Sequence, residues 1–195
     1  MATWDYPTTL MPQDLSWGSV KAGAQSTSIF NSATESIEFP GERWLVSLTL
    51  PERKSRNGGE AEAFFGRISG GMERVRLWHF LRPVPRGSMR GAPTLAAAAS
   101  RGELSLQITT TGTLEAGDLF KVGNQVFQAF QSCAPVGGVL TVPLVQRVRS
   151  TLAAGAAVQW DKPTALFVMP SKTHRTPYRP GAQERIAVDF EEVYL

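Results

Sequence analysis

The chain has 195 residues, of which 42% are hydrophobic and 19% charged, and this length suits one large domain or one domain with a modest insertion. A chain of this size buries enough surface to fold without a metal ion or a disulfide. Its 20 basic and 17 acidic residues give a net charge of only +3, which argues against a dedicated nucleic-acid binder, whose basic residues gather in a dense stripe.

The cellular setting is indicated by three further features. Cys133 is the only cysteine, which excludes an intrachain disulfide and favours assembly in a reducing cytoplasm. Residues 1–7 lack the basic and apolar regions of a signal peptide. Because the longest apolar runs, such as residues 95–99, are too short to cross a bilayer, we expect a soluble protein with no membrane partner.

The first 27 residues are rich in polar residues, yet they contain Trp4, Tyr6 and Trp17. Large aromatic side chains in a polar arm indicate that the arm docks on its own domain or on a neighbouring subunit. Trp4, Tyr6 and Trp17 are therefore candidate inter-subunit contacts. An edge strand of the same domain explains the segment equally well.

The clearest strand comes after a weakly alternating stretch over residues 28–39. Pro40 and Gly41 predict a turn. Over residues 43–50, Trp44, Val46, Leu48 and Leu50 share one face at the period of a half-buried strand. Pro51 ends this strand.

A helix is predicted next, because Ala61, Phe64, Phe65 and Ile68 recur at helical spacing. We expect it to begin near Asn57 or Gly58 and to stop at Gly70 and Gly71. A second strand follows over residues 75–80. Residues 43–81 thus form a strand–helix–strand unit in which the helix covers one face of the sheet.

Residues 82–93 contain three prolines and two glycines after Arg82, so we expect an extended, exposed boundary segment. Beyond it, short strands are predicted at 104–108, 119–122, 125–130 and 157–160, with a further one around Pro143. Gly123-Asn124 is a hairpin signal between two of them. Four or five short strands in about seventy residues describe a small β-barrel.

The last two predicted strands, residues 165–169 and 186–195, rejoin residues 43–81 in one sheet. The predicted fold is therefore mainly β with one or two short helices: an antiparallel sheet main domain covered by a helix, with a small inserted β-barrel. The main domain, β-sandwich-like, comprises residues 1–86 and 164–195. The inserted domain comprises residues 87–163.

No catalytic, metal or cofactor-binding set emerges, and we expect a protein that is not an enzyme and needs no cofactor. His79 and His174 are the only histidines, and neither belongs to a metal-binding motif. His79 is expected to be a partly buried strand residue with a satisfied hydrogen bond. No charged residue adjoins Cys133 to lower its pKa, so we expect an inert thiol.

Four segments, in order, resemble the distal tail protein class of long-tailed bacteriophages. They are residues 39–51 (FPGERWLVSLTLP), 61–71 (AEAFFGRISGG), 114–123 (LEAGDLFKVG), and 142–149 (VPLVQRVR) followed by 155–158 (GAAV). The first two resemble the strand and covering helix of that class. The last two resemble the start and the close of its inserted barrel.

The resemblance implies a structural protein of the virion tail tip, or baseplate, assembled in the host cytoplasm. Such proteins form a homo-oligomeric ring, usually a hexamer, that joins the tail tube protein to the hub and central fibre proteins and lets DNA pass. Non-specific passage of DNA calls for a lumen whose basic residues are balanced by acidic ones. The alternatives are a binding module for nucleic acid or carbohydrate that uses the inserted barrel, and an enzyme.

Overall fold

A computed structural model describes residues 1–194, except for the side chains of residues 40, 55 and 56. The chain divides into two compact units. The sheet unit comprises Met1–Gly18, Trp44–Pro83 and the chain from Thr164 onward; the insert unit comprises Ser19–Arg43 and Val84–Pro163. The boundaries after Pro83 and Pro163 lie within three residues of those predicted, but residues 19–43 group with the insert and not with the main domain.

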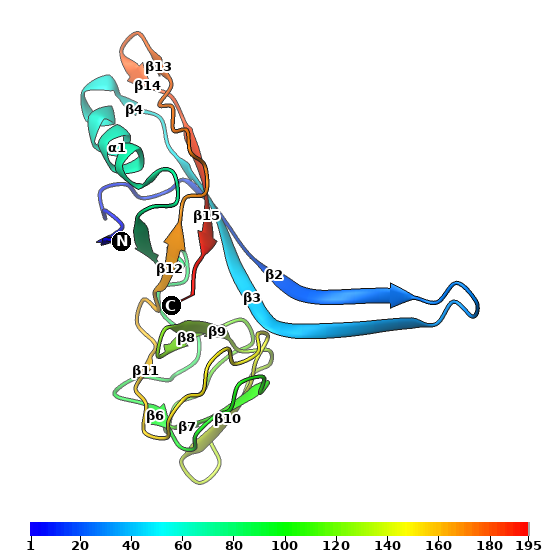
Figure 1. Ribbon diagram of the computed structural model, residues 1–195. Helices are drawn as coiled ribbons and strands as arrows, with labels where there is room; N and C mark the ends of the chain where they lie inside the picture. Colours follow the sequence, from blue (N-terminus) through cyan, green and yellow to red (C-terminus); the bar gives the residue numbers. More distant parts are fainter. Residues whose placement is uncertain (195) are drawn as a thin grey trace. The chain divides into compact units, whose positions relative to one another are not determined.

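The main sheet has six strands (Figure 1). In spatial order they are β1 (Thr3–Asp5), β5 (Arg74–Leu77), β12 (Ala165–Val168), β15 (Ile186–Glu192), β3 (Thr34–Leu50) and β2 (Asp14–Thr27). β1 pairs with β5 in parallel, whereas β5, β12, β15 and β3 pair antiparallel. The prediction that the last strands of the chain rejoin residues 43–81 is confirmed, as is the mainly β fold class.

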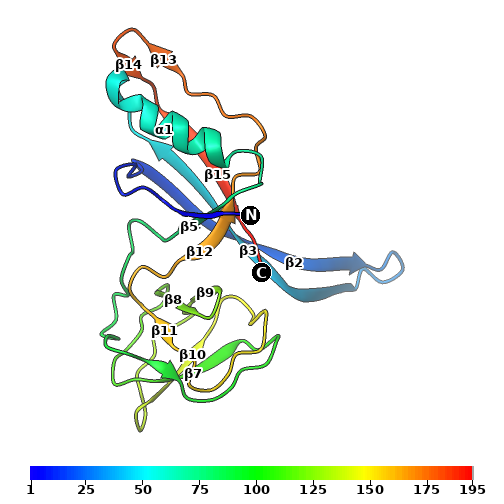
Figure 2. The ribbon, with the colours of Figure 1, turned by 60° about the vertical axis from the view of Figure 1, so that its left-hand side comes forward.

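The helix α1 (Ser55–Ile68) packs beside a smaller sheet of β13 (Tyr178–Arg179), β14 (Ala182–Gln183) and β4 (Arg53–Lys54). β4 and β14 continue the register in which β3 and β15 pair, so the second sheet of this unit prolongs the first (Figure 2). Ala61, Phe65 and Ile68 on α1 are fully buried.

The helix begins two residues before the predicted start and stops where the glycines predict it. Gly70 and Gly71 have φ values of +89° and +71°, a left-handed conformation that favours glycine and ends a helix. With 14 residues, α1 is too short for a membrane span, and no other helix in residues 1–194 is long and apolar enough for one.

Gln183, on β14, is fully buried beside α1. Neither of its amide atoms has a hydrogen-bond partner among the described residues. A Cβ atom at Gly58 would lie 2.7 Å from Oε1 of Gln183, so the glycine makes room for this amide. An unsatisfied buried amide costs about 1–3 kcal/mol.

We expect Gln183→Met to raise the free energy of unfolding by about 1 kcal/mol, because methionine fills the space without polar atoms. Urea unfolding measures the change. Gln131→Met, at an exposed position, is the matched control and should leave stability unchanged. A loss of stability in Gln183→Met would show that the amide has a partner, such as a bound water.

Within the insert unit, residues 84–163 (the insert module) form two three-stranded antiparallel sheets. One has the order β10 (Val139–Pro143), β7 (Ser105–Thr109), β6 (Thr94–Leu95); the other β11 (Val158–Gln159), β8 (Leu119–Val122), β9 (Gln125–Gln128). Single bridges, Thr94–Ala157 and Ala129–Leu144, join the sheets at both edges. The six strands therefore form a ring of neighbours, and a pair of backbone hydrogen bonds accompanies each of the two bridges.

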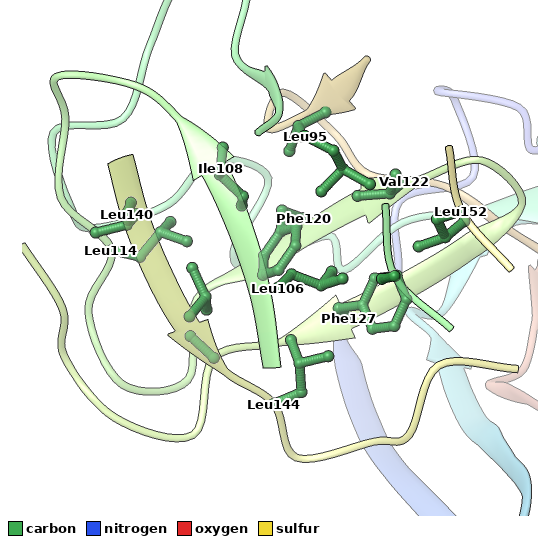
Figure 3. Packing of buried hydrophobic residues seen from close by; sticks show 14 of the residues in the cluster. Leu95, Leu106, Ile108, Leu114, Phe120, Val122, Phe127, Leu140, Leu144 and Leu152 are labelled. Carbon is green, nitrogen blue, oxygen red and sulfur yellow. The ribbon is translucent and has the colours of Figure 1, made fainter. Parts of the chain in front are cut away.

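A single apolar core fills the insert module (Figure 3). Phe120 and Phe127 stack at its centre with ring centroids 5.8 Å apart. Leu106 and Ile108 from β7 lie opposite Val142 and Leu140 from β10, and all four are buried. This core explains why short strands, each too weak to stand alone, fold as a module.

The proline-rich boundary segment is not exposed as predicted. Pro85, Gly87, Met89 and Pro93 are buried at alternating positions. The backbone N–H of Met89 donates to the carbonyl of Thr113 at 3.0 Å. The prolines and glycines of this segment suggested an exposed linker. The side chains of an extended chain alternate between two faces, so every second residue of this segment lies in the core while the others stay outside it.

Asp118 fastens this segment to the module. Its buried carboxylate accepts three backbone hydrogen bonds: Oδ1 from Arg86 N–H at 2.9 Å, and Oδ2 from Gly87 N–H at 3.0 Å and Glu115 N–H at 2.8 Å. Two of these donors belong to the boundary segment and one to the turn that precedes β8. One side chain therefore holds together chain segments about thirty residues apart.

Candidate assembly surfaces

The three aromatic residues predicted as inter-subunit contacts occupy different environments in the sheet unit. Tyr6 is 2% exposed, and its hydroxyl donates to the Leu10 carbonyl at 2.7 Å. Trp17 packs against other rings of the unit. Trp4 is 42% exposed, although its Nε1 donates to Glu73 at 2.7 Å. Their contact with a neighbour stays a prediction, and Trp4 is the most exposed of the three.

Trp17 belongs to an aromatic cluster that also includes His79. Its ring centroid lies 5.6 Å from that of Trp44, 5.3 Å from that of His79 and 5.7 Å from that of Phe167. β2, which carries Trp17, lies at the edge of the main sheet. The part of the polar arm around Trp17 is therefore an edge strand of its own sheet.

His79 is buried, as expected, but lies just beyond β5. Its Nε2 is 3.3 Å from Nε of Arg82. The backbone N–H of Arg82 donates to the His79 carbonyl at 3.0 Å, so this N–H does not need an imidazole nitrogen as its acceptor. A neutral imidazole has one acceptor nitrogen, and Nε2 is best placed to accept from the guanidinium. Burial first, and the Arg82 charge second, lower the pKa of His79 to about 4.

The distal parts of β2 and β3 form a two-stranded ribbon, residues 19–43, which ends in the loop 28–33 (Figure 1). The predicted turn at Pro40 and Gly41 is wrong, because β3 runs unbroken through them. β15 pairs only with residues 45–50 of β3. Residue 40 therefore lies beyond that ladder, where a proline is tolerated as on an edge strand.

The ribbon has one polar and one apolar face. Lys21, Glu38 and Glu42 lie on one face, since the Lys21 ammonium is 3.0 Å from Glu38 and 3.9 Å from Glu42. Side chains alternate along a strand, so the opposite face carries the intervening residues, which on β3 are apolar between Glu35 and Arg43. These are Val20, Ala22 and Ala24 of β2 with Ile37 and Phe39 of β3, and Val20, Ile37 and Phe39 are each at least half exposed.

The polar face is joined to the insert module by Arg147, whose guanidinium lies 3.0 Å from Glu38. The hydrogen bond from Lys21 lowers the pKa of Glu38, and the same bond raises the pKa of Lys21. Burial raises the pKa of Glu42. Opposite charges therefore face one another at this junction.

A groove of about 390 Å³ lies beside this junction. Its walls are largely apolar and its rim carries the paired charges; the lining residues are Lys21, Glu38, Leu104, Phe130, Pro143, Leu144 and Val145. Phe130 is 67% exposed although it is a large aromatic residue. An apolar groove of this size is suited to apolar side chains of a partner.

Sequence reasoning missed the ribbon and the groove. The signal for the ribbon was present, because residues 22–34 contain no charged residue, and apolar residues keep a period of two at Ala22 and Ala24 and again at Ile37 and Phe39. The groove had no such signal, since its residues come from five separate stretches of the chain.

The remaining candidate residues form no further site. Cys133 is half-buried, and burial raises the pKa of its thiol. Within residues 1–194, no cluster of three or more histidine, cysteine, aspartate or glutamate residues has the arrangement of a metal site.

No protein-family model matches this chain, and no curated protein matches its sequence.

Proposed function

We propose that the chain is a non-enzymatic structural subunit of a bacteriophage tail tip, which forms a homo-oligomeric ring between the tail tube and the hub or central fibre and lets DNA pass. Its four ordered sequence segments resemble the distal tail protein class. The tail-tip location rests on this resemblance, and assembly has independent physical support in the ribbon.

The exposed ribbon is the observation that carries the assembly part of the proposal. Five apolar residues on one face of a two-stranded ribbon form a surface that a monomer leaves in water, and such patches mark interaction sites. β2 also lies at the edge of the sheet over 14 residues. Asp14 and Lys21 are its only charged residues, so little protects this edge against pairing with another chain.

Electron microscopy of the purified chain over a range of concentrations tests the proposal. We expect closed rings around a lumen. The double variant Ile37→Ser, Phe39→Ser should weaken subunit association tenfold or more, because fully burying a large apolar side chain is favourable by about 1.5–3 kcal/mol. Met72→Ser, which alters an exposed apolar residue of the sheet unit, is the matched control. If the double variant forms rings as well as the wild type, the apolar face of the ribbon has no role in assembly.

A further inference from the structure

The loop at the end of the ribbon, residues 28–33 (the ribbon tip), is a built turn with two exposed apolar side chains. Ser28 N–H donates to the Ala33 carbonyl at 2.8 Å, and Ser32 N–H to the Ser28 carbonyl at 3.0 Å. Ile29 is 91% exposed and Phe30 94%. These are the two most exposed large apolar residues described in the chain, and burying them in an apolar site would be favourable.

The side chains of Ser28 and Asn31 hold the tip in place. The Ser28 hydroxyl accepts from Phe30 N–H at 3.3 Å, and Asn31 Oδ1 accepts from Ala33 N–H at 3.1 Å. A turn fixed in this way presents Ile29 and Phe30 with little further ordering on binding, which reduces the entropic cost of an interface.

The groove beside Phe130 fits the tip in chemistry. Residues 22–34 carry no charge, and the charges at the groove rim face opposite charges, Lys21 with Glu38 and Glu38 with Arg147. A charged side chain bound there would lose its hydration and find the charges at the rim already paired with one another. An uncharged apolar side chain would instead bury its surface against Leu104, Phe130 and Val145.

The tip of a given copy cannot occupy its own groove. Lys21, on the groove rim, and Thr27, next to the tip, belong to the same strand β2. A strand rises about 3.3 Å per residue, so the tip is held about 20 Å from the rim by its own ribbon. The occupant that fits is the tip of a second copy.

We infer that Ile29 and Phe30 at the ribbon tip of one copy insert into the groove beside Phe130 of the next copy. The contact is heterologous, with different surfaces on the two partners, so it leaves a free groove and a free tip at every step and generates a ring or a filament. The inference rests on the proposed assembly and names the contact that carries it.

A complementation experiment tests the contact with full-length chains. The tip variant Ile29→Ser, Phe30→Ser and the groove variant Phe130→Asp change exposed residues, so both should fold as the wild type does, which circular dichroism checks. Alone, each variant should lose assembly at least tenfold in sedimentation velocity. Mixed, they should form a one-to-one heterodimer, because one partner supplies an intact tip and the other an intact groove.

Val136→Asp, at an exposed apolar position of the insert module outside the groove, is the matched control and should assemble normally. If the wild type assembles and both variants assemble equally well, the tip–groove contact is wrong while the proposed ring stands. If the variants fail but their mixture forms no heterodimer, the contact is also overturned. If heterodimers form but the chain is not found on phage tails, the contact is supported and the proposed function is refuted.

Discussion

Asp118→Ala is expected to unfold the insert module more readily than any other single substitution considered, lowering its stability by roughly 3 kcal/mol or more. Three backbone N–H groups lose their acceptor together, that of Gly87 buried and those of Arg86 and Glu115 part-buried, and a buried donor left without a partner costs about 1–3 kcal/mol. The loss falls short of the full sum because the opened site admits water.

Amide hydrogen exchange locates this effect within the chain. We expect β8 and β9 to lose protection in Asp118→Ala, since Asp118 directly precedes β8 and its carbonyl accepts from the N–H of Ala129, the residue after β9. Asp161→Ala, at an exposed position of the same module, is the matched control and should leave exchange unchanged. Asp118→Asn should fall between the two, because an amide retains one acceptor oxygen. Unchanged protection of β8 and β9 in Asp118→Ala would contradict the structural role given to the carboxylate.

The sheet unit should lose about 2–3 kcal/mol of stability between pH 7.5 and pH 4.5 through His79. Its pKa falls from an ordinary 6.5 to about 4 in the folded chain, so the unfolded chain binds a proton more readily. The stabilisation by neutral His79 is therefore complete above pH 6.5. It is lost as the pH falls toward 4, at 1.36 kcal/mol per pH unit.

Urea unfolding followed by tryptophan fluorescence measures this dependence. In a Trp160→Phe background the emission comes from the sheet unit, which holds the other four tryptophans. His79→Gln should flatten the pH profile between 4.5 and 6.5. Burial also lowers the pKa of His174, but this residue is only half-buried, so His174→Gln should change the profile less. Equal profiles for His79→Gln and the wild type would refute the assignment.

Local patterns in the sequence predicted the elements whose partners are close in the chain or strongly apolar. The alternation from Trp44 to Leu50 predicts β3, and the spacing of Ala61, Phe65 and Ile68 predicts α1. Both patterns reflect burial of a single face, which depends on the period of the element and not on the identity of its partner. The return of β12 and β15 to the same sheet follows from their apolar character.

The misses come from features that a local pattern does not encode. Pro40 and Gly41 suggested a turn, but at that point β3 has left the ladder with β15, and a proline costs little there. The boundary segment near Met89 looked like a linker because its prolines prevent ladder hydrogen bonds. Its burial depends on Asp118 and Thr113, which lie more than twenty residues away. The groove beside Phe130 likewise exists only once distant segments meet.

The most direct measurement of the central claim is electron microscopy of phage particles from cells that carry this gene, labelled with gold-conjugated antibody against the chain. The proposal predicts label confined to the distal end of the tail, and image reconstruction of that end should show a ring with the β2–β3 ribbon of each copy against its neighbour. Particles that carry no label at the tail tip, or label only on the capsid, would contradict the claim.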